Sequence, residues 1–507
     1  MTELHELTLA EQAAAIRERT VSPVDLVDHH LRRIDRLNDA VGAYRTVDHR
    51  GARQAAAAAE ARLAAAEDTS QLPPLLGVPI SVKDTWPVAG LPFTGGSAVF
   101  ADRIAPADAA VVGALRAAGT VLLGTTLAAE FGCSAYTETA HGTARSPYDL
   151  NRGAGGSSGG AAASVAARLA AGALGSDGGG SIRIPAAACG LVGLKPSRGR
   201  VTPAPGTDAL GLATAGPLAR TVFDTALLLD VMAHSTPGDS GTLPAGPPGT
   251  FRASAERAPG RLRIGVLPET AGQDGPSRLG CRRTADLLAE LGHQVDEAPP
   301  FGPAEYLAAF TAVWSVLAAS VPVPPGREGD LLALTAWLRS EGRARSAPDL
   351  LAAHASLTAT ARELLSRYAE FDVILSPTTD TLAPPVGSLV DQDAPERTFA
   401  RMLDFTPRTP LANITGQPSI SLPLHWTPDG LPVGIMLTGR PHQEATLLAL
   451  GAQLEQARPW LHHTPQPVLD RDSALRAAGH RDAARQVTGH RDTAHRGLAF
   501  QAEGGTT

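Results

Sequence analysis

The sequence predicts an α/β fold in which helices cover both faces of a central β-sheet. Two observations support this prediction. Short apolar runs with strand character alternate along the chain with longer segments that have a helical pattern. The chain of 507 residues is 43% hydrophobic, which is enough to bury a large core between a sheet and its covering helices.

The N-terminal part is expected to be mainly helical. Thr8 and Glu11 have the spacing of a capping box, which marks the start of a helix. Ser22 followed by Pro23 predicts an N-cap with proline at the first helical position, and a helix that continues through about Asn38. The alanine-rich segment Gln54–Glu67 predicts a further helix.

The strands of the predicted sheet follow these helices. Leu76–Val82 is an apolar run that predicts a buried strand. Asp108–Ala118 predicts a helix and Thr120–Leu123 a strand, so the alternation continues. Later elements are predicted as strands at Arg261–Leu267, Phe371–Leu375 and Pro432–Leu437 and as a helix at Ser277–Leu291.

Residues 1–470 are predicted to form a single domain, whose core motifs lie between residues 75 and 205. Phe301–Tyr368 is predicted to be mainly helical. Ser235–Gly260 is rich in Gly, Pro and Ser, which predicts a loop or linker over the surface.

Residues 471–507 form a near-repeat of ten residues, RDSALRAAGH, RDAARQVTGH and RDTAHRGLAF. His480 and His490 recur in it, but a spacing of ten does not bring two histidines together on one helical face within reach of a metal ion. We therefore interpret this segment as a flexible tail.

Charge and hydropathy exclude several classes of protein. The net charge of −7 is small for this length and gives no electrostatic reason to expect nucleic-acid binding. No run of about 18 apolar residues lacks a charge, so we expect no membrane span. The acidic N-terminus lacks the positive and apolar regions of a signal peptide.

The cysteines point to a reducing compartment. Cys133, Cys189 and Cys281 are far apart and lack the CxxC spacing of a zinc site. We therefore predict a cytoplasmic protein without a disulfide framework, and we expect neither a metal nor another cofactor.

A glycine-rich stretch between residues 155 and 199 is the main candidate for a site. Two Gly/Ser turns, Gly155–Gly160 and Gly178–Ser181, flank the helix-like segment Ala161–Ala171 and a short apolar piece, Ala173–Gly175. Because glycine has no Cβ, its backbone N–H groups can approach a ligand closely. A serine beside several free N–H groups has the parts of a nucleophile with an oxyanion hole.

Two other interpretations of this stretch remain open. Gly/Ser-rich turns are commonly linkers. In addition, the pentapeptide from Gly155 to Gly159 fits the G-x-S-x-G pattern of a nucleophile elbow, with Ser157 as the nucleophile and a downstream histidine as its base.

Lysine usage singles out two positions. The chain contains 44 Lys and Arg residues, and only Lys83 and Lys195 are lysine. A buried lysine can lose its proton and act as a base, whereas arginine stays charged. Lys83 ends the apolar run GVPISVK and suits a general base, while Lys195 is interpreted as a structural or ligand-facing charge.

The motifs GGSSGG, DGGGSIRIPA and GLVGLKP, with VPISVKD upstream, resemble the amidase signature family. The resemblance extends from about Leu7 to about Pro465. It implies a mixed central sheet covered by helices on both faces and hydrolysis of an amide bond through an acyl-enzyme. It also implies a Ser–cis-Ser–Lys catalytic set without histidine.

Carried over residue by residue, the resemblance implies that Ser181 is the nucleophile, that Ser157 is the bridging serine held by a cis peptide bond, and that Lys83 is the base. Asp177 and Arg183 are expected to support the two loops by hydrogen bonds. The oxyanion donors are expected to be the backbone N–H groups of Gly178, Gly179, Gly180 and Ser181.

The sequence departs from the family at two positions. The family commonly has Thr or Ile in place of Gly178, which implies a looser oxyanion loop, and KPT in place of the KPS that contains Ser197. Ile184, in SIRIPA, resembles the members that act on aryl amides and cyclic oligoamides more than the amidotransferase subunit, which usually has Gln there.

The resulting prediction is a hydrolase of a small-molecule amide, with ester substrates left open. The alternative is the glutamine-hydrolysing subunit of a tRNA-dependent amidotransferase. A catalytically inactive binding protein is a third class, and the intact set of Lys83, Ser157 and Ser181 argues against it. We expect no nucleic-acid or membrane partner and leave a homodimer open.

Overall fold

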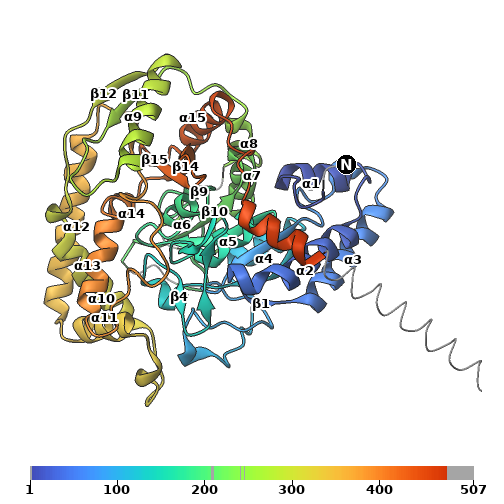
Figure 1. Cartoon of the computed structure of the whole chain (residues 1–507), viewed down its shortest axis with the longest axis horizontal. Coiled ribbons are helices and arrows are strands. Elements are labelled where there is room, and N and C mark those ends of the chain that lie inside the picture. Colours follow the sequence, from blue (N-terminus) through green and yellow to red (C-terminus); the bar gives the residue numbers. More distant parts are fainter. Residues whose placement is uncertain (1–2, 207–209, 240, 245, 477–507) are drawn as a thin grey trace, which may run out of the picture.

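A computed structural model of the chain describes residues 3–206, 210–239, 241–244 and 246–476. At its centre is a mixed sheet, in which β2 and β3 run parallel while β14 and β15 run antiparallel (Figure 1). In spatial order its 11 strands are β1 (Tyr44–Val47), β3 (Val121–Thr126), β2 (Pro79–Lys83), β8 (Gly172–Asp177), β10 (Thr214–Ala219), β9 (Val192–Lys195), β14 (Ser419–Trp426), β15 (Pro432–Gly439), β13 (Val373–Pro377), β11 (Arg263–Val266) and β12 (Gln294–Glu297).

Helices cover both faces of this sheet, which confirms the predicted fold class. Successive strand residues point to opposite faces, so Leu122 and Leu174 join one buried cluster while Leu123 and Ala173 join another. The first cluster contains side chains of α1 (Leu9–Arg17), α4 (Ala110–Ala117), α7 (Val222–Met232), α8 (Thr250–Ala255), α9 (Gly275–Glu290) and α15 (Glu444–Ala457). The second contains side chains of α2 (Pro23–Val41), α3 (His49–Ala65), α5 (Gly159–Ala166) and α6 (Arg183–Ala188).

A third group of helices packs at one side of the molecule, away from the N-terminal helices (Figure 1). It comprises α10 (Leu307–Ser320), α11 (Ala333–Arg343), α12 (Ala347–Arg367), α13 (Pro395–Phe405) and α14 (Thr409–Thr415). The predicted helical character of residues 301–368 is confirmed. No helix among the described residues is long and apolar enough to cross a membrane.

Short elements complete the fold. Two hairpins pair β4 (Glu138–Thr139) with β5 (Gly142–Thr143), and β6 (Arg145–Ser146) with β7 (Asp149–Gly153). The 3-10 helices are η1 (Thr69–Gln71), η2 (Ala98–Phe100), η3 (Glu130–Gly132), η4 (Pro303–Glu305) and η5 (Glu328–Asp330).

The N-terminal capping signals are confirmed. The Thr8 side chain accepts a hydrogen bond from the Glu11 amide, and the Glu11 carboxylate accepts one from the Thr8 amide. The Ser22 hydroxyl caps α2, which continues three residues beyond Asn38 to Val41. The helix predicted at Ala161–Ala171 is shorter than expected, because α5 ends at Ala166 and the chain turns at Arg168, whose φ is 57°.

The prediction of a loop or linker at Ser235–Gly260 is wrong in part. Thr250–Ala255 forms α8, which buries Phe251 in the core. Asp230, on α7, caps this helix from outside the segment. Its carboxylate accepts hydrogen bonds from the amides of Phe251 and Arg252, at 2.9 and 3.0 Å.

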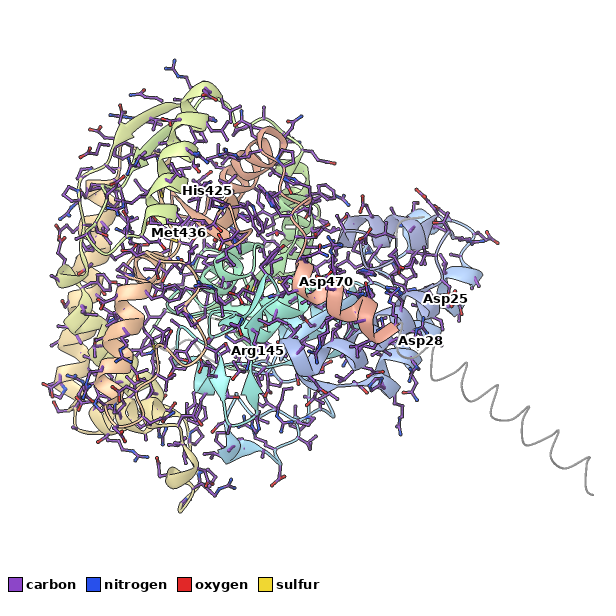
Figure 2. All side chains as sticks on the ribbon, in the orientation of Figure 1. Asp25, Asp28, Arg145, His425, Met436 and Asp470 are labelled. Atoms are coloured by element: carbon purple, nitrogen blue, oxygen red, sulfur yellow. The ribbon has the colours of Figure 1, made fainter. Side chains whose placement is uncertain are left out.

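The boundary predicted at residue 470 falls inside a helix at residues 466–476, and residues 477–507 lie outside the described residues. This helix lies beside α2, as the positions of Asp470, Asp25 and Asp28 in Figure 2 illustrate. Its Asp472 carboxylate accepts hydrogen bonds from the buried Arg33 guanidinium at 2.5 Å and from Arg36 at 2.7 Å. The first residues of the predicted tail therefore belong to the packed fold.

Candidate active site

The two Gly/Ser turns lie against each other at the centre of the molecule. Strand β8 leads into the second turn, and α5 begins directly after the first. The Ser158 amide donates to the Ser181 carbonyl at 3.2 Å, and the Ser158 hydroxyl donates to the Ser176 carbonyl at 3.2 Å. Gly155–Gly160 is buried throughout, so the interpretation of this turn as a linker is wrong.

Lys83 and Ser157 meet in the interior. The Lys83 Nζ lies 2.7 Å from the Ser157 Oγ and 2.8 Å from the Ser176 Oγ. The Gly156–Ser157 peptide bond is cis, as the resemblance implied. Gly156 must be glycine, because a Cβ there would lie 2.4 Å from the Tyr136 carbonyl oxygen.

The surroundings of Lys83 favour its neutral form. Its side chain is fully buried, and this burial lowers its pKa from 10.5 to about 7, although the negative charge of Asp177 acts in the opposite direction. The Asp177 carboxylate is bonded to Arg183 instead of Lys83. A lysine that is part neutral near pH 7 and within hydrogen-bond distance of a serine has the chemistry of a general base.

The nucleophile-elbow interpretation is not supported. The side-chain partner of the Ser157 hydroxyl is Lys83, and no histidine among the described residues hydrogen-bonds to Ser157. An elbow needs a histidine in that position to activate its serine.

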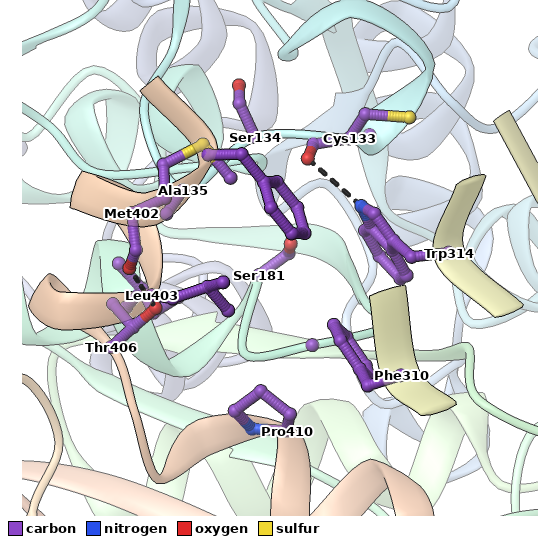
Figure 3. A pocket seen from close by; sticks show the side chains of 14 residues that line it. Cys133, Ser134, Ala135, Ser181, Phe310, Trp314, Met402, Leu403, Thr406 and Pro410 are labelled. Atoms are coloured by element: carbon purple, nitrogen blue, oxygen red, sulfur yellow. Dashed lines mark hydrogen bonds between the residues drawn. The ribbon is translucent and has the colours of Figure 1, made fainter. Parts of the chain in front are cut away.

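Ser181 lies at the floor of a pocket, between β8 and α6 (Figure 3). It is 6% exposed, whereas Ser157 beneath is 1% exposed. The pocket encloses about 380 Å³ out to its open mouth, and its other walls come from the segment 132–135 and from α10 and α13. Of the three predicted catalytic side chains, Ser181 is therefore the one that a substrate can reach.

Asp177 and Arg183 brace the loop that presents Ser181. The Arg183 Nε and Nη2 donate to the two carboxylate oxygens of Asp177 at 3.0 and 2.9 Å, and both side chains are fully buried. Burial alone would raise the pKa of Asp177, but the Arg183 guanidinium outweighs it and holds that pKa well below its usual range. The pair is ionised and rigid.

One predicted oxyanion donor is already engaged. The Gly180 amide donates to the Asp177 carboxylate at 2.8 Å, as does the Ile182 amide at 3.1 Å, so Gly180 cannot also donate to an oxyanion. This corrects the prediction of four backbone donors to three, at Gly178, Gly179 and Ser181. Gly180 has a φ of 125°, which is a glycine conformation.

Three further residues of the site were not predicted. Ser176 is the second hydroxyl at Lys83, and its position next to Asp177 was a signal that the sequence offered. Asn413, on α14, donates to the Asp177 carbonyl and carboxylate at 3.0 and 2.9 Å and accepts from Arg183 at 2.8 Å. The Thr409 hydroxyl donates to the Gly179 carbonyl at 2.7 Å. Nothing in the local sequence marks Asn413 or Thr409, which lie far along the chain.

The second lysine, Lys195, is as buried as the first but contacts no serine. Its Nζ donates to the Pro196 carbonyl at 2.7 Å, and burial lowers its pKa to about 7. Its interpretation as a structural charge fits these contacts, because it is enclosed at the end of β9 and does not line the pocket.

One group of described side chains has the composition of a metal site. Ligand atoms of Glu3, His5 and His29 lie within 4.8 Å of one another. The two histidines hydrogen-bond to each other at 2.9 Å, and the charges of Arg33 and Arg476 act on this pair and oppose a cation there. The group is not part of the Ser181 pocket.

Comparisons with known proteins agree over most of the chain. A family model described as Amidase matches residues 25–448. A relative from Mycobacterium tuberculosis (strain ATCC 25618 / H37Rv), named "Putative amidase AmiB2", is 40% identical over 477 residues, covering 92% of this chain and 99% of the relative. A glutamyl-tRNA(Gln) amidotransferase subunit from Acidothermus cellulolyticus is 37% identical over 519 residues, with 94% and 100% covered. A solved 6-aminohexanoate cyclic dimer hydrolase has a TM-score of 0.83 at 30% identity, with 92% and 100% covered.

Proposed function

The chain belongs to the amidase signature family and is a hydrolase of carboxylic amide bonds, and we propose that it acts through Ser181 as nucleophile, Ser157 as proton carrier and Lys83 as base. Neutral Lys83 accepts a proton from Ser157, which accepts one from Ser181. The Ser181 oxygen then attacks the amide carbonyl carbon. The observation that carries this proposal is the 2.7 Å contact between the Lys83 Nζ and the Ser157 Oγ, in surroundings that lower the lysine pKa to about 7.

The remaining steps use the same residues in reverse. The amides of Gly178, Gly179 and Ser181 stabilise the oxyanion of the tetrahedral intermediate, a contribution of roughly 3–4 kcal/mol for each donor. When the carbon–nitrogen bond breaks, protonated Lys83 returns its proton through Ser157 to the leaving amine. Water, deprotonated by the same relay, then cleaves the ester bond to Ser181 and releases the acid.

The glutamine-hydrolysing alternative is not favoured. An amidotransferase subunit is a relative, but AmiB2 shares more identity with this chain, and the solved neighbour is a hydrolase of a cyclic amide. Ile184, which lines the pocket beside Ser181, also stands where the resemblance leads us to expect Gln in the amidotransferase subunit.

A fluorophosphonate probe tests the assignment of the nucleophile. We expect one phosphonylated residue per chain in the wild type, located by mass spectrometry at Ser181, and no labelling of Ser181→Ala. Ser134→Ala is a matched control, since Ser134 lines the same pocket without contacting Lys83 or Ser157, and it should still be labelled. Labelling that persists in Ser181→Ala but disappears in Ser157→Ala would favour the elbow and contradict the proposal.

The cytoplasmic location also belongs to this proposal. Cys133, Cys189 and Cys281 are free and buried, which suits a reducing compartment. Fractionation of the native cells, with thiol counting by mass spectrometry, tests it. Discovery of the protein in an extracellular fraction would contradict it. The absence of a nucleic-acid partner and the open homodimer remain predictions.

A further inference from the structure

The walls of the Ser181 pocket are apolar and uncharged. The side chains that surround Ser181 include Ile184, Phe310, Trp314, Phe399, Met402 and Leu403. None of the described residues that line it is Asp, Glu, Lys, Arg or His. The nearest ionised pair of the site, Asp177 and Arg183, is fully buried and bonded to itself. A charged substrate group that entered this pocket would lose its hydration without gaining a counter-charge.

One wall of the pocket is flat and aromatic. Phe310 and Trp314 are stacked, with ring centroids 5.3 Å apart and an angle of 18° between the planes, and both come from α10. The Trp314 Nε1 is fixed by a hydrogen bond to the Cys133 carbonyl at 3.2 Å, which Figure 3 shows across the mouth of the pocket. The rings are thus held in position on both sides.

Gly178 allows this wall to reach the oxyanion loop. A Cβ at Gly178 would lie 3.3 Å from two ring carbons of Trp314, and a Cβ at Gly179 would lie 3.4 Å from the Phe310 ring. A branched residue at position 178, which the resemblance led us to expect, would push Trp314 away. The departure from the family at Gly178 therefore goes together with an aromatic surface next to the scissile carbonyl.

The geometry also indicates which half of the substrate meets this wall. The leaving nitrogen must face Ser157, which returns a proton to it, and Ser157 lies behind Gly132, 3.4 Å from where a Gly132 Cβ would stand. Figure 3 shows Cys133, the neighbour of Gly132, and Phe310 on opposite sides of Ser181. The acyl substituent of the carbonyl, which points away from the leaving nitrogen, therefore faces the aromatic side.

We infer that the Ser181 pocket takes an uncharged, apolar acyl group, and a flat aromatic one in preference to a saturated ring. The inference rests on the proposed role of Ser181. It excludes glutamine as the preferred substrate, because the ammonium and carboxylate of glutamine belong to its acyl half.

A set of primary amides that differ only in terminal charge tests the inference. Hexanamide, 6-aminohexanamide and 5-carboxypentanamide have the same chain length and are neutral, cationic and anionic at pH 7. We expect kcat/KM for hexanamide to exceed both charged isosteres by at least about a hundredfold. Benzamide should exceed cyclohexanecarboxamide by about three- to tenfold, since the aromatic wall favours a planar ring. Glutamine should be no better than the charged isosteres.

A charge placed in the pocket should change this order. Leu403→Lys introduces a cation into the wall and should raise the ratio of kcat/KM for 5-carboxypentanamide over hexanamide by at least about tenfold. Leu351→Lys is the matched control, because Leu351 is 70% exposed on α12 and does not line the pocket, and it should leave the ratio unchanged. Varying the amine half, as in N-methyl and N-carboxymethyl benzamides, should not reproduce the effect of Leu403→Lys.

The outcomes separate this inference from the proposed function. Equal rates on neutral and charged isosteres, lost in Ser181→Ala, would overturn the inference and leave the hydrolase mechanism standing. A Leu403→Lys effect that appears only in the amine series would overturn the assignment of the acyl half. Absence of both hydrolysis and fluorophosphonate labelling would overturn the proposed function, and the inference with it.

Discussion

Replacement of Lys83 is the sharpest test of the catalytic relay. We expect Lys83→Met and Lys83→Arg to lose about a hundred- to ten-thousandfold in kcat/KM, the usual contribution of a general base, or about 3–5 kcal/mol of transition-state stabilisation. Arginine keeps the charge but cannot release its proton, so the transfer from Ser157 over 2.7 Å cannot occur. Methionine keeps the length and burial of the side chain but has no basic atom.

The pH dependence follows from the same side chain. Since the base must be neutral and burial lowers the Lys83 pKa to about 7, kcat/KM should rise about tenfold per pH unit below pH 7 and level off above it. Stability should respond in the same direction. Between about pH 7 and pH 10.5 the unfolded chain holds a proton on this lysine that the folded chain lacks, so the free energy of unfolding rises with pH, and Lys83→Met should lose that part of the rise.

Lys195 provides the control for burial. It is equally buried and its pKa is also about 7, but its Nζ contacts only the Pro196 carbonyl. Lys195→Met should therefore change stability and leave the midpoint of the kcat/KM profile near pH 7. The sequence alone suggested Lys195→Arg as a mild change, but a fully buried site has no room for the longer side chain. A folded Lys83→Arg enzyme within about tenfold of the wild type, a loss of only about 1.4 kcal/mol, would remove Lys83 from the mechanism.

Two further substitutions test the supports of the site and of the fold. Asn413→Ala leaves the Asp177 carbonyl without a partner and should lower the free energy of unfolding by about 1–3 kcal/mol in urea titrations, together with kcat; an unchanged kcat would show that the loop does not need this brace. Asp472→Ala leaves the buried Arg33 unpaired and should cost about 3–5 kcal/mol, whereas the exposed Asp470→Ala on the same helix should stay within about 0.5 kcal/mol; equal melting temperatures would show that residues 466–476 do not stabilise the fold.

The sequence by itself determined the features that depend on near neighbours or on chemical type. The caps at Thr8 and Ser22 were predictable, because a capping side chain bonds to amides two or three residues away. The alternation of strands and helices gave the fold class for the same reason. The scarcity of lysine marked Lys83, because only its chemistry distinguishes it from the arginine used at other positive positions.

Only the tertiary structure decided which groups of the site are free and what surrounds them. The Gly180 amide is a candidate donor in the sequence, yet the Asp177 carboxylate occupies it. Asn413 reaches Asp177 across more than two hundred residues, and the aromatic wall of the pocket comes from α10, which no motif links to Ser181. Hydrogen bonds and pocket walls of this kind depend on how distant segments pack. Residue pattern constrains that packing only through burial, and it carries no signal for the individual contacts.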